Sequence, residues 1–237
     1  MMKEHLVVLG AGPGGYAAAF YAADQGYKVT LLDSSEKPGG VCLHRGCIPS
    51  KALIHVAGLM TKAVQAKDWG IDFGEPKIDL KRLREWKDEI SLKISDGLIS
   101  LCKQRDVSFI NSRGSFTDSN TIQLSNSSTL VFDRCIIATG SRPVMPQKFI
   151  NNKLIIMDST EALKLSTIPE KMLVVGGGYI GLELGKVYSS LGSRVTIVEM
   201  QDGLLPNVDR DLVRPLHQKL SNEFEAIYLN TEIISIQ

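Results

Sequence analysis

The sequence predicts an α/β fold built from two similar units, the second of them incomplete. One pattern occurs twice: a short apolar strand, a glycine-rich turn, a helix, and a second strand that ends in an acid. Both copies keep the same spacing, because the step from Gly10 to Gly176 equals the step from Asp33 to Glu199 (176 − 10 = 199 − 33). This shared difference in residue number is the repeat offset. Strands that alternate with helices along the chain are typical of a parallel sheet.

The elements of the two copies follow one another in the same order. In the first copy the apolar strand is predicted at residues 6–9, the turn at 10–15, the helix at 16–25 and the acid-ending strand at 28–33. In the second copy the same elements are predicted at 172–175, 176–181, 182–191 and 194–199. Hydrophobic periodicity and glycine turns between the elements support both assignments.

Three spaced glycines give each turn its chemistry. The first permits the tight turn from strand to helix, the second lets the backbone approach a pyrophosphate, and the third allows the helix to pack closely on the strand. They are Gly10, Gly12 and Gly15, then Gly176, Gly178 and Gly181, with Gly14, Tyr179 and Ile180 beside them as further candidates. The pyrophosphate would lie at the positive helix end. Two Rossmann-like dinucleotide-binding units are therefore predicted, and the alternative is a glycine-rich turn in an ordinary α/β domain.

The acid at the end of each second strand extends the prediction to the ribose. Asp33 and Glu199 follow the third glycine of their own turn at the same spacing (33 − 15 = 199 − 181). A carboxylate at this position accepts hydrogen bonds from ribose hydroxyls. Since an acid there repels a 2′-phosphate, Glu199 favours NAD over NADP. Two such units indicate two dinucleotides, one of which delivers electrons to the other.

Two thiols stand five positions apart after the first unit. Cys42 and Cys47 are flanked by glycines that make the loop flexible enough to bring the sulfurs together. Pro49 fits the first turn of a helix predicted at about 49–67, so Cys47 would lie where the helix dipole favours a thiolate. A reversible redox disulfide is the favoured interpretation. A zinc site, which lacks a second Cys pair, and two inert buried thiols are the alternatives.

The segments between the motifs complete the predicted organisation. A loop at 68–76 is followed by a helix at 79–105, whose apolar residues recur at spacings of three and four. Strands are predicted at 107–110, 114–116, 121–124 and 132–138. Cys102 and Cys135 are predicted to be core residues. A proline-rich linker then separates a first domain, residues 1–143, from a second domain, residues 144–237.

Composition excludes several classes of protein. The formal net charge is +1, so no charge excess favours nucleic acid or an anionic membrane. The first apolar run is too short for a signal or membrane segment. Four cysteines are too few for a secreted disulfide scaffold, so we expect a reducing, cytoplasmic setting. No metal site is predicted.

The string GVCLHRGCIPSK, residues 40–51, resembles the active-site signature of the flavin-dependent pyridine nucleotide–disulfide oxidoreductases. GGGYIGLE at 176–183 and Ala138-Thr139-Gly140 resemble further signatures of that family. The resemblance implies that the first unit binds FAD and the second binds NAD. Cys47 would be the thiol next to the flavin and Cys42 the thiol that exchanges with substrate.

The resemblance also implies roles for residues that would otherwise look ordinary. Lys51 would lie near the flavin and pair with Glu183, although most lysines are simply solvated and an acid near a helix start is common. The other residues implied at the FAD site are Gly40, Val41, Gly114, Ala138, Thr139 and Gly140. Two departures affect this site: Val41 replaces the usual Thr beside the flavin, and Asp33 replaces the longer Glu.

Within the family, Ser50-Lys51 is most similar to the branch that oxidises dihydrolipoamide, which is carried in some systems on a lipoyl domain of a 2-oxoacid dehydrogenase complex. Family members continue past the position of Gln237 and end in an interface domain that forms a homodimer and supplies a His–Glu pair. We therefore expect this chain to be the N-terminal part, inactive alone. The alternatives are a related disulfide or mercuric reductase, and a non-catalytic fragment that binds FAD and NAD.

Overall fold

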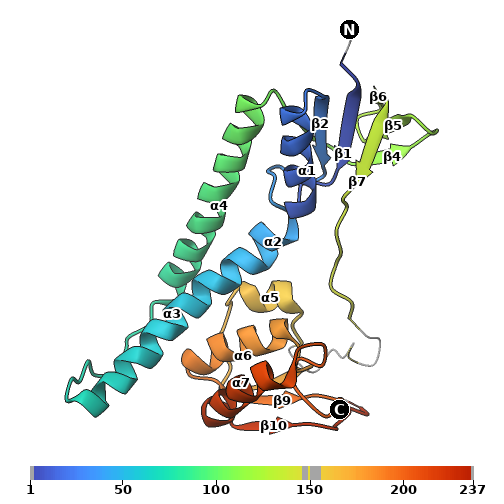
Figure 1. Ribbon diagram of the computed structural model, residues 1–237. Helices are drawn as coiled ribbons and strands as arrows, with labels where there is room; N and C mark the ends of the chain where they lie inside the picture. Colours follow the sequence, from blue (N-terminus) through green and yellow to red (C-terminus); the bar gives the residue numbers. More distant parts are fainter. Residues whose placement is uncertain (1–2, 146–148, 150–155, 236–237) are drawn as a thin grey trace. The chain divides into compact units, whose positions relative to one another are not determined.

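The computed structural model describes residues 3–145, 149 and 156–235 (Figure 1). The chain forms two compact units, residues 1–49 with 88–142 and residues 50–87 with 143–237. Two helices, α3 (Cys47–Gln65) and α4 (Leu80–Gln104), are divided between the units. The functional domains predicted at 1–143 and 144–237 follow chain order instead, and that division stays a prediction.

The first unit is built on a parallel sheet with strand order β3-β2-β1-β7, and a smaller antiparallel sheet has the order β4-β5-β6. Helix α1 lies against β1 and β2 (Figure 1). The elements that belong wholly to this unit are β1 (His5–Leu9), α1 (Pro13–Asp24), β2 (Lys28–Asp33), α2 (Gly40–Arg45), β3 (Ser108–Asn111), β4 (Gly114–Phe116), β5 (Thr121–Leu124), β6 (Thr129–Val131) and β7 (Arg134–Ile137).

Both faces of the first parallel sheet are covered, as apolar runs without alternation require. On one face Val8 and Leu31 pack with Ala19 of α1. On the other face Val7 and Leu32 pack with residues of the antiparallel sheet and with Phe132. These four strand residues have no exposed surface, so the ends of β1 and β2 are held rigidly where the glycine turn begins.

The second unit has a parallel sheet with strand order β10-β9-β8. Its largest fully buried side chains include Tyr188, Ile197 and Leu204. A capping box begins its helix α5, since Asp158 accepts from the Glu161 backbone and Glu161 from the Asp158 backbone. The elements that belong wholly to this unit are η1 (Ala66–Trp69), α5 (Ser159–Leu163), β8 (Lys171–Val175), α6 (Tyr179–Ser190), β9 (Arg194–Val198), α7 (Arg210–Glu223) and β10 (Ala226–Tyr228).

The two units repeat the same strand pairing. His5 pairs with Lys28 between β1 and β2, and Lys171 pairs with Arg194 between β8 and β9, in both positions one repeat offset later. The predicted α/β class with two Rossmann-like units is confirmed. Both glycine-turn helices, both acid-ending strands and the strand at 114–116 lie within a few residues of their predicted bounds.

The second sheet has an uncovered edge. In the part of the chain that the structure describes, β8 pairs only with β9, whereas its counterpart β1 pairs with β2 and β7. One face of β8 is exposed as well, since Leu173 on β8 is 55% exposed, while the equivalent Val7 on β1 is packed under the antiparallel sheet and 0% exposed. An apolar edge strand of this kind is a site for pairing with a further strand.

One local expectation was wrong. The segment around Cys42, expected as a flexible loop, forms the short helix α2, which begins at Gly40; Gly39 and Gly40 both have positive φ. The apolar stripe of α4 is buried at Leu98 and solvated at Ile94, which is 41% exposed. The buried positions of α4 include Ser91 and Ser95, and the Ser95 hydroxyl is satisfied by the Pro38 carbonyl at 2.7 Å. A hydrogen-bonded serine permits close packing that a larger apolar residue would block.

Several elements had no strong sequence signal. The short helix α5, the helix α7 and the strands β6 and β10 were not predicted. Helix α7 contains Pro215, which the pattern rules of helices disfavour in an interior. No helix of the described residues has the length and apolar character that a membrane span requires.

Candidate functional site

The glycine turn of the first unit is tightly packed. Gly10 has φ +104°, and a Cβ built on it would lie 2.2 Å from the Ala138 carbonyl oxygen. A Cβ on Gly15 would lie 1.7 Å from the Gly10 carbonyl oxygen. Gly12 caps α1, and Gly14 in its first turn has open space where a Cβ would point. The turn therefore leaves the backbone N–H groups at the start of α1 accessible to an anion.

The predicted segment Ala138-Thr139-Gly140 passes beside this turn. The Ala138 N–H donates to the Leu9 carbonyl at 2.8 Å, and the Cα of Thr139 lies 3.1 Å from the position of a Gly10 Cβ. Gly114 instead lies in apolar packing, because a Cβ there would be 2.8 Å from the Leu32 side chain. Its predicted contact with the adenine end of FAD stays a prediction.

Each acid at the end of a second strand braces its own glycine turn. Asp33 accepts from the backbone N–H of Ala11 at 2.6 Å and of Ser35 at 2.7 Å. Glu199, which is buried, accepts from the backbone N–H of Gly177 at 2.6 Å and of Gln201 at 2.8 Å. The two pairs of donors are again related by the repeat offset. A carboxylate has about four acceptor positions, so both acids keep capacity for ribose hydroxyls.

The second glycine turn repeats the first. Gly176 has φ +104°, as Gly10 has, and Gly178 caps α6. A Cβ on Gly181 would lie 2.4 Å from the Gly176 carbonyl oxygen. Tyr179 and Ile180, in the first turn of α6, are 67% and 44% exposed. Two exposed apolar side chains at a helix start form a surface on which a flat ring can stack.

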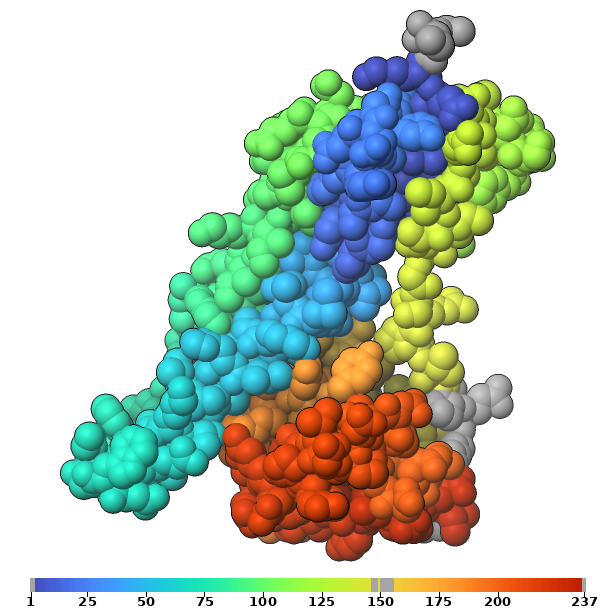
Figure 2. Space-filling view, viewed as in Figure 1, coloured from blue at the N-terminus to red at the C-terminus, as the bar shows by residue number. Residues whose placement is uncertain are grey.

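The thiol pair lies at a junction of two helices. Cys42 is on α2 and half-buried, and Cys47 is the first residue of α3 and exposed. The chain turns back sharply between them, since a Cβ on Gly46 would lie 3.4 Å from the Cα of Cys42. The chain around residue 47, light blue in Figure 2, is part of the surface in that view. Cys47 thus lies at the start of a 19-residue helix, as the sequence predicted.

Helix α2, which carries Cys42 and is called the thiol helix below, is attached to the first glycine turn. The Gly39 N–H donates to the Ala11 carbonyl at 2.8 Å. A Cβ on Gly40 would lie 2.5 Å from the Cα of Gly12, so no larger residue fits between them. Val41, the next residue, is 40% exposed. The cofactor contacts predicted for Gly40 and Val41 stay predictions.

Sequence reasoning missed Tyr16. Burial raises the pKa of the Tyr16 phenol, and the charges of Cys42 and Cys47 raise this pKa further. The Tyr16 hydroxyl therefore keeps its proton and is available as a hydrogen-bond donor near both thiols. Its position one turn into α1 carried no signal that linked it to the thiols.

A charge pair joins α3 to α6 within the second unit. The Lys51 ammonium lies 2.7 Å and 2.9 Å from the two carboxylate oxygens of Glu183. The buried Ser50 hydroxyl donates to the same carboxylate at 3.0 Å. The predicted Lys51–Glu183 pair is therefore present, and Ser50 is a third member that the sequence did not single out.

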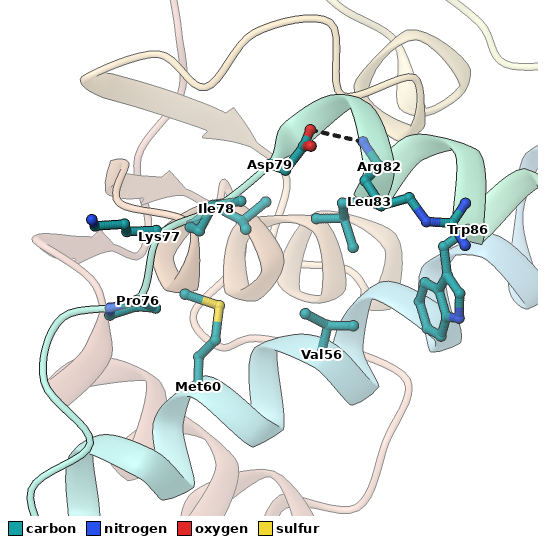
Figure 3. A pocket seen from close by; sticks show the side chains of 10 residues that line it. Val56, Met60, Pro76, Lys77, Ile78, Asp79, Arg82, Leu83 and Trp86 are labelled. Atoms are coloured by element: carbon teal, nitrogen blue, oxygen red, sulfur yellow. Dashed lines mark hydrogen bonds between the residues drawn. The ribbon is translucent and has the colours of Figure 1, made fainter.

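Two cavities lie in the second unit. One of about 330 Å³ is lined by apolar and charged residues of α3, α6 and α7 and by Leu205, and its wall includes Tyr179 and Glu183. Another of about 430 Å³ lies between α3 and the start of α4, where Met60 and Trp86 face it (Figure 3). The second cavity contains none of the predicted site residues. Among residues 3–145, 149 and 156–235, no three His, Cys, Asp or Glu side chains are grouped as a metal site requires.

Comparison with known proteins adds to this geometry. Residues 4–237 match the family model described as pyridine nucleotide-disulphide oxidoreductase. The chain is 42% identical over its whole length to a dihydrolipoyl dehydrogenase of Vibrio parahaemolyticus, covering 50% of that protein, and 42% identical to one of Haemophilus influenzae, with the same coverage. The chain thus spans about half the length of the curated relatives it matches.

A solved structure agrees in fold. The HOCl-induced flavoprotein disulfide reductase RclA from Escherichia coli superposes with a TM-score of 0.80 at 26% sequence identity. The match covers 97% of this chain and 49% of that one.

Proposed function

Because the chain belongs to the pyridine nucleotide-disulphide oxidoreductase family, we propose that it is the part of a dihydrolipoamide dehydrogenase that holds FAD, NAD and the redox thiol pair. In the whole protein, dihydrolipoamide and NAD react to lipoamide and NADH. The observation that carries the proposal is the attachment of the thiol helix to the first glycine turn, through Gly39 to Ala11 and Gly40 against Gly12. It joins a disulfide site to a dinucleotide site.

The first unit fits the pyrophosphate and ribose of FAD. The start of α1 offers backbone donors with no side chain over Gly12 or Gly14, and Asp33 lies beside the turn. A Cβ at Gly10 would clash with the Ala138 carbonyl oxygen and a Cβ at Gly15 with the Gly10 carbonyl oxygen, which explains why this turn requires glycine there. The FAD set would comprise Gly10, Gly12, Gly14, Gly15, Asp33, Gly40, Val41, Lys51, Gly114, Ala138, Thr139 and Gly140.

The second unit fits NAD by the same geometry. Glu199 takes the place of Asp33, and its negative charge opposes the 2′-phosphate of NADP. The exposed Tyr179 and Ile180 at the start of α6 give the dinucleotide an apolar surface. The NAD set would comprise Gly176, Gly178, Tyr179, Ile180, Gly181 and Glu199.

The thiol pair would perform a balanced exchange with the substrate. A thiolate of dihydrolipoamide attacks the sulfur of Cys42 in the Cys42–Cys47 disulfide, and Cys47 leaves as a thiolate. The second substrate thiol attacks the substrate sulfur of this mixed disulfide and releases Cys42. The substrate loses two electrons and two protons, and the protein pair gains them. When bound, FAD supplies the acceptor for this electron pair and NAD carries it away as hydride.

Three neighbours would support the exchange. The Tyr16 hydroxyl, kept protonated by its raised pKa, can donate a hydrogen bond to a thiolate. The Lys51–Glu183 pair lies one turn along the helix that starts at Cys47, and Ser50 holds the Glu183 carboxylate in place.

A half-reaction tests the proposal without a complete turnover. The FAD-loaded chain, with Cys42 and Cys47 oxidised, is mixed with dihydrolipoamide, and lipoamide is quantified by chromatography. We expect about one lipoamide per chain, and none from Cys42→Ser or Cys47→Ser. Cys102→Ala, which removes a buried thiol elsewhere in the first unit, is the matched control and should react like the parent chain. Equal yields from all four proteins would refute the assigned roles.

Two alternatives remain distinguishable. A related disulfide or mercuric reductase is favoured by the fold of RclA, whereas the 42% identity to dihydrolipoyl dehydrogenases favours lipoamide over it. A panel of lipoamide, glutathione disulfide and Hg²⁺ separates these substrates. A non-catalytic FAD- and NAD-binding fragment would bind both cofactors and form no lipoamide in the half-reaction.

The proposal extends to partners and location. A homodimer, a lipoyl domain of a 2-oxoacid dehydrogenase complex as carrier of the substrate, and a cytoplasmic setting belong to it. Analytical ultracentrifugation of the complete enzyme and pull-down with a lipoylated domain test the first two.

A further inference from the structure

The repeat between the two units continues past the acid into the following loop. In the first unit the Gly39 N–H donates to the Ala11 carbonyl at 2.8 Å. In the second the Leu205 N–H donates to the Gly177 carbonyl at 3.0 Å. The repeat offset relates both partners of the two bonds, and Gly39 and Leu205 both have positive φ, +135° and +48°. The loop that follows each acid is therefore hydrogen-bonded to the glycine turn of its own unit.

In each of these loops a side chain donates a hydrogen bond to the backbone carbonyl at the equivalent position, and we call this contact the clamp. His44 bonds through Nε2 to the Pro38 carbonyl at 3.1 Å. Arg210, one repeat offset later, donates from Nη1 to the carbonyl of Leu204 at 2.9 Å. A carbonyl only accepts, so His44 carries its proton on Nε2 and acts as a donor, as arginine always does. The amino acids differ, but the bond they make is equivalent.

The carbonyl that accepts the clamp lies next to the bond that holds the glycine turn. It belongs to Pro38 or Leu204, and the next residue, Gly39 or Leu205, has positive φ and donates its N–H to the turn. Left-handed backbone is unfavourable for a leucine, so Leu205 needs outside support. Arg210 supplies it with further bonds, from Nε to the Val208 carbonyl at 3.0 Å and from Nη2 to the carbonyls of Leu205 and Val208.

The contact with the turn is direct in the second unit. Leu204 is fully buried, and its Cδ2 lies 2.5 Å from the position of a Cβ on Gly177. In the first unit the same loop leads at once into α2, with Cys42 two residues before His44. The first clamp thus acts on both the glycine turn and the thiol helix.

We propose that His44 and Arg210 are equivalent positioning residues, each of which holds the glycine turn of its own unit, and that His44 also sets the geometry of Cys42 for disulfide closure. What the two turns bind rests on the proposed function, whereas the clamps themselves do not. Ser95 also donates to the Pro38 carbonyl at 2.7 Å, so loss of His44 removes one of two side-chain hydrogen bonds to this carbonyl and leaves the other.

The test uses the 237-residue chain with His44→Ala, His44→Gln, Arg210→Ala and Arg210→Lys. The Cys42–Cys47 pair is equilibrated with mixtures of dithiothreitol and its cyclic disulfide, which exchange two electrons and two protons with it, and thiols are counted by maleimide labelling. We expect His44→Ala to shift the equilibrium toward the dithiol by about fivefold, the loss of one neutral hydrogen bond. His44→Gln, which keeps an N–H donor, should restore it, and Arg210→Ala should leave it unchanged.

Amide hydrogen exchange, measured by mass spectrometry, tests whether each variant loosens only the loop of its own unit. His44→Ala should speed amide exchange in residues 34–46 and not in 200–209, and Arg210→Ala should do the opposite, with Arg210→Lys intermediate. Faster exchange in both segments for either variant would indicate general destabilisation and overturn the proposal. Unchanged exchange and an unchanged thiol equilibrium would overturn it as well.

Measurements of FAD and NAD binding by the same variants separate this inference from the proposed function. His44→Ala should weaken FAD binding about fivefold and leave NAD unaffected, and Arg210→Ala should weaken NAD binding about tenfold or more, as expected for a charge-assisted bond. A parent chain that binds neither cofactor would contradict the proposed function, while the thiol and exchange measurements would still decide the positioning roles.

Discussion

Replacement of Gly15 by alanine should disrupt the first unit, whereas the same change at Gly14 should not. A Cβ on Gly15 would lie 1.7 Å from the Gly10 carbonyl oxygen, half of the 3.4 Å at which ordinary contacts begin. Neither partner can move easily, because Gly10 is itself pressed against the Ala138 carbonyl. Overpacking of a rigid site costs typically 1–3 kcal/mol, and this contact is between backbone groups, so we expect about 3 kcal/mol.

At Gly14 a Cβ meets no atom within 4 Å. Alanine in a helix is favoured over glycine by roughly 0.5–1 kcal/mol, so Gly14→Ala should be neutral or slightly stabilising. For a chain of this length 1 kcal/mol corresponds to roughly 2–4 °C in Tm. Thermal unfolding followed by circular dichroism should therefore give a Tm about 6–12 °C lower for Gly15→Ala and equal or slightly higher for Gly14→Ala.

The two neighbouring glycines thus separate steric packing from helix propensity. FAD affinity, measured by flavin fluorescence, should fall for Gly15→Ala together with the Tm. Equal Tm values for the two variants would show that the helix shifts at no cost, and the packing argument would fail.

Three further predictions follow from other parts of the molecule. Burial raises the pKa of the Cys102 thiol above its value in the unfolded chain, so the contribution of this thiol to stability should be full below pH about 8.5 and be lost as pH rises through the folded pKa. The urea midpoint of the parent chain should therefore fall between pH 8 and 10, and that of Cys102→Ala should fall less. An equal fall in the parent chain and the variant would contradict this. Glu199→Gln replaces one acceptor oxygen with an amide that cannot accept from the Gly177 or Gln201 N–H, so NAD affinity measured by calorimetry should drop about tenfold, whereas Asp33→Asn should spare NAD. Leu173→Lys on the edge strand β8 should reduce self-association in light scattering, and Leu212→Lys on helix α7, which is also exposed, should not. Equal effects of both would argue against edge pairing.

Much of the fold could be predicted because its signals are local. The glycine spacing of Gly10, Gly12 and Gly15, the apolar runs beside it and the acid at 33 lie within one strand–helix–strand unit. The same pattern at 176–199 repeats it. Helix α7 was missed because Pro215 lies inside it, and the short β6 and β10 offered too few residues for a period to be seen.

The site was predicted only in part. Lys51 and Glu183, which lie far apart in the sequence, were paired through the family resemblance, and the structure brings them within 2.7 Å. Tyr16 and Ser50 had no sequence signal, since a tyrosine after a glycine turn and a serine before a lysine are ordinary. Only packing places one near the thiols and the other on the Glu183 carboxylate.

By itself the sequence determined the two-unit α/β plan, the glycine turns, the acids and the close spacing of the thiols, because each depends on neighbours along the chain. Tertiary structure alone decided that Cys42 lies on a short helix seated against Gly12, and that His44 and Arg210 hold equivalent loops. The physical reason is that a histidine and an arginine share no residue type or pattern. Their equivalence exists only in the carbonyl oxygens to which they donate, and the folded backbone decides where those oxygens lie.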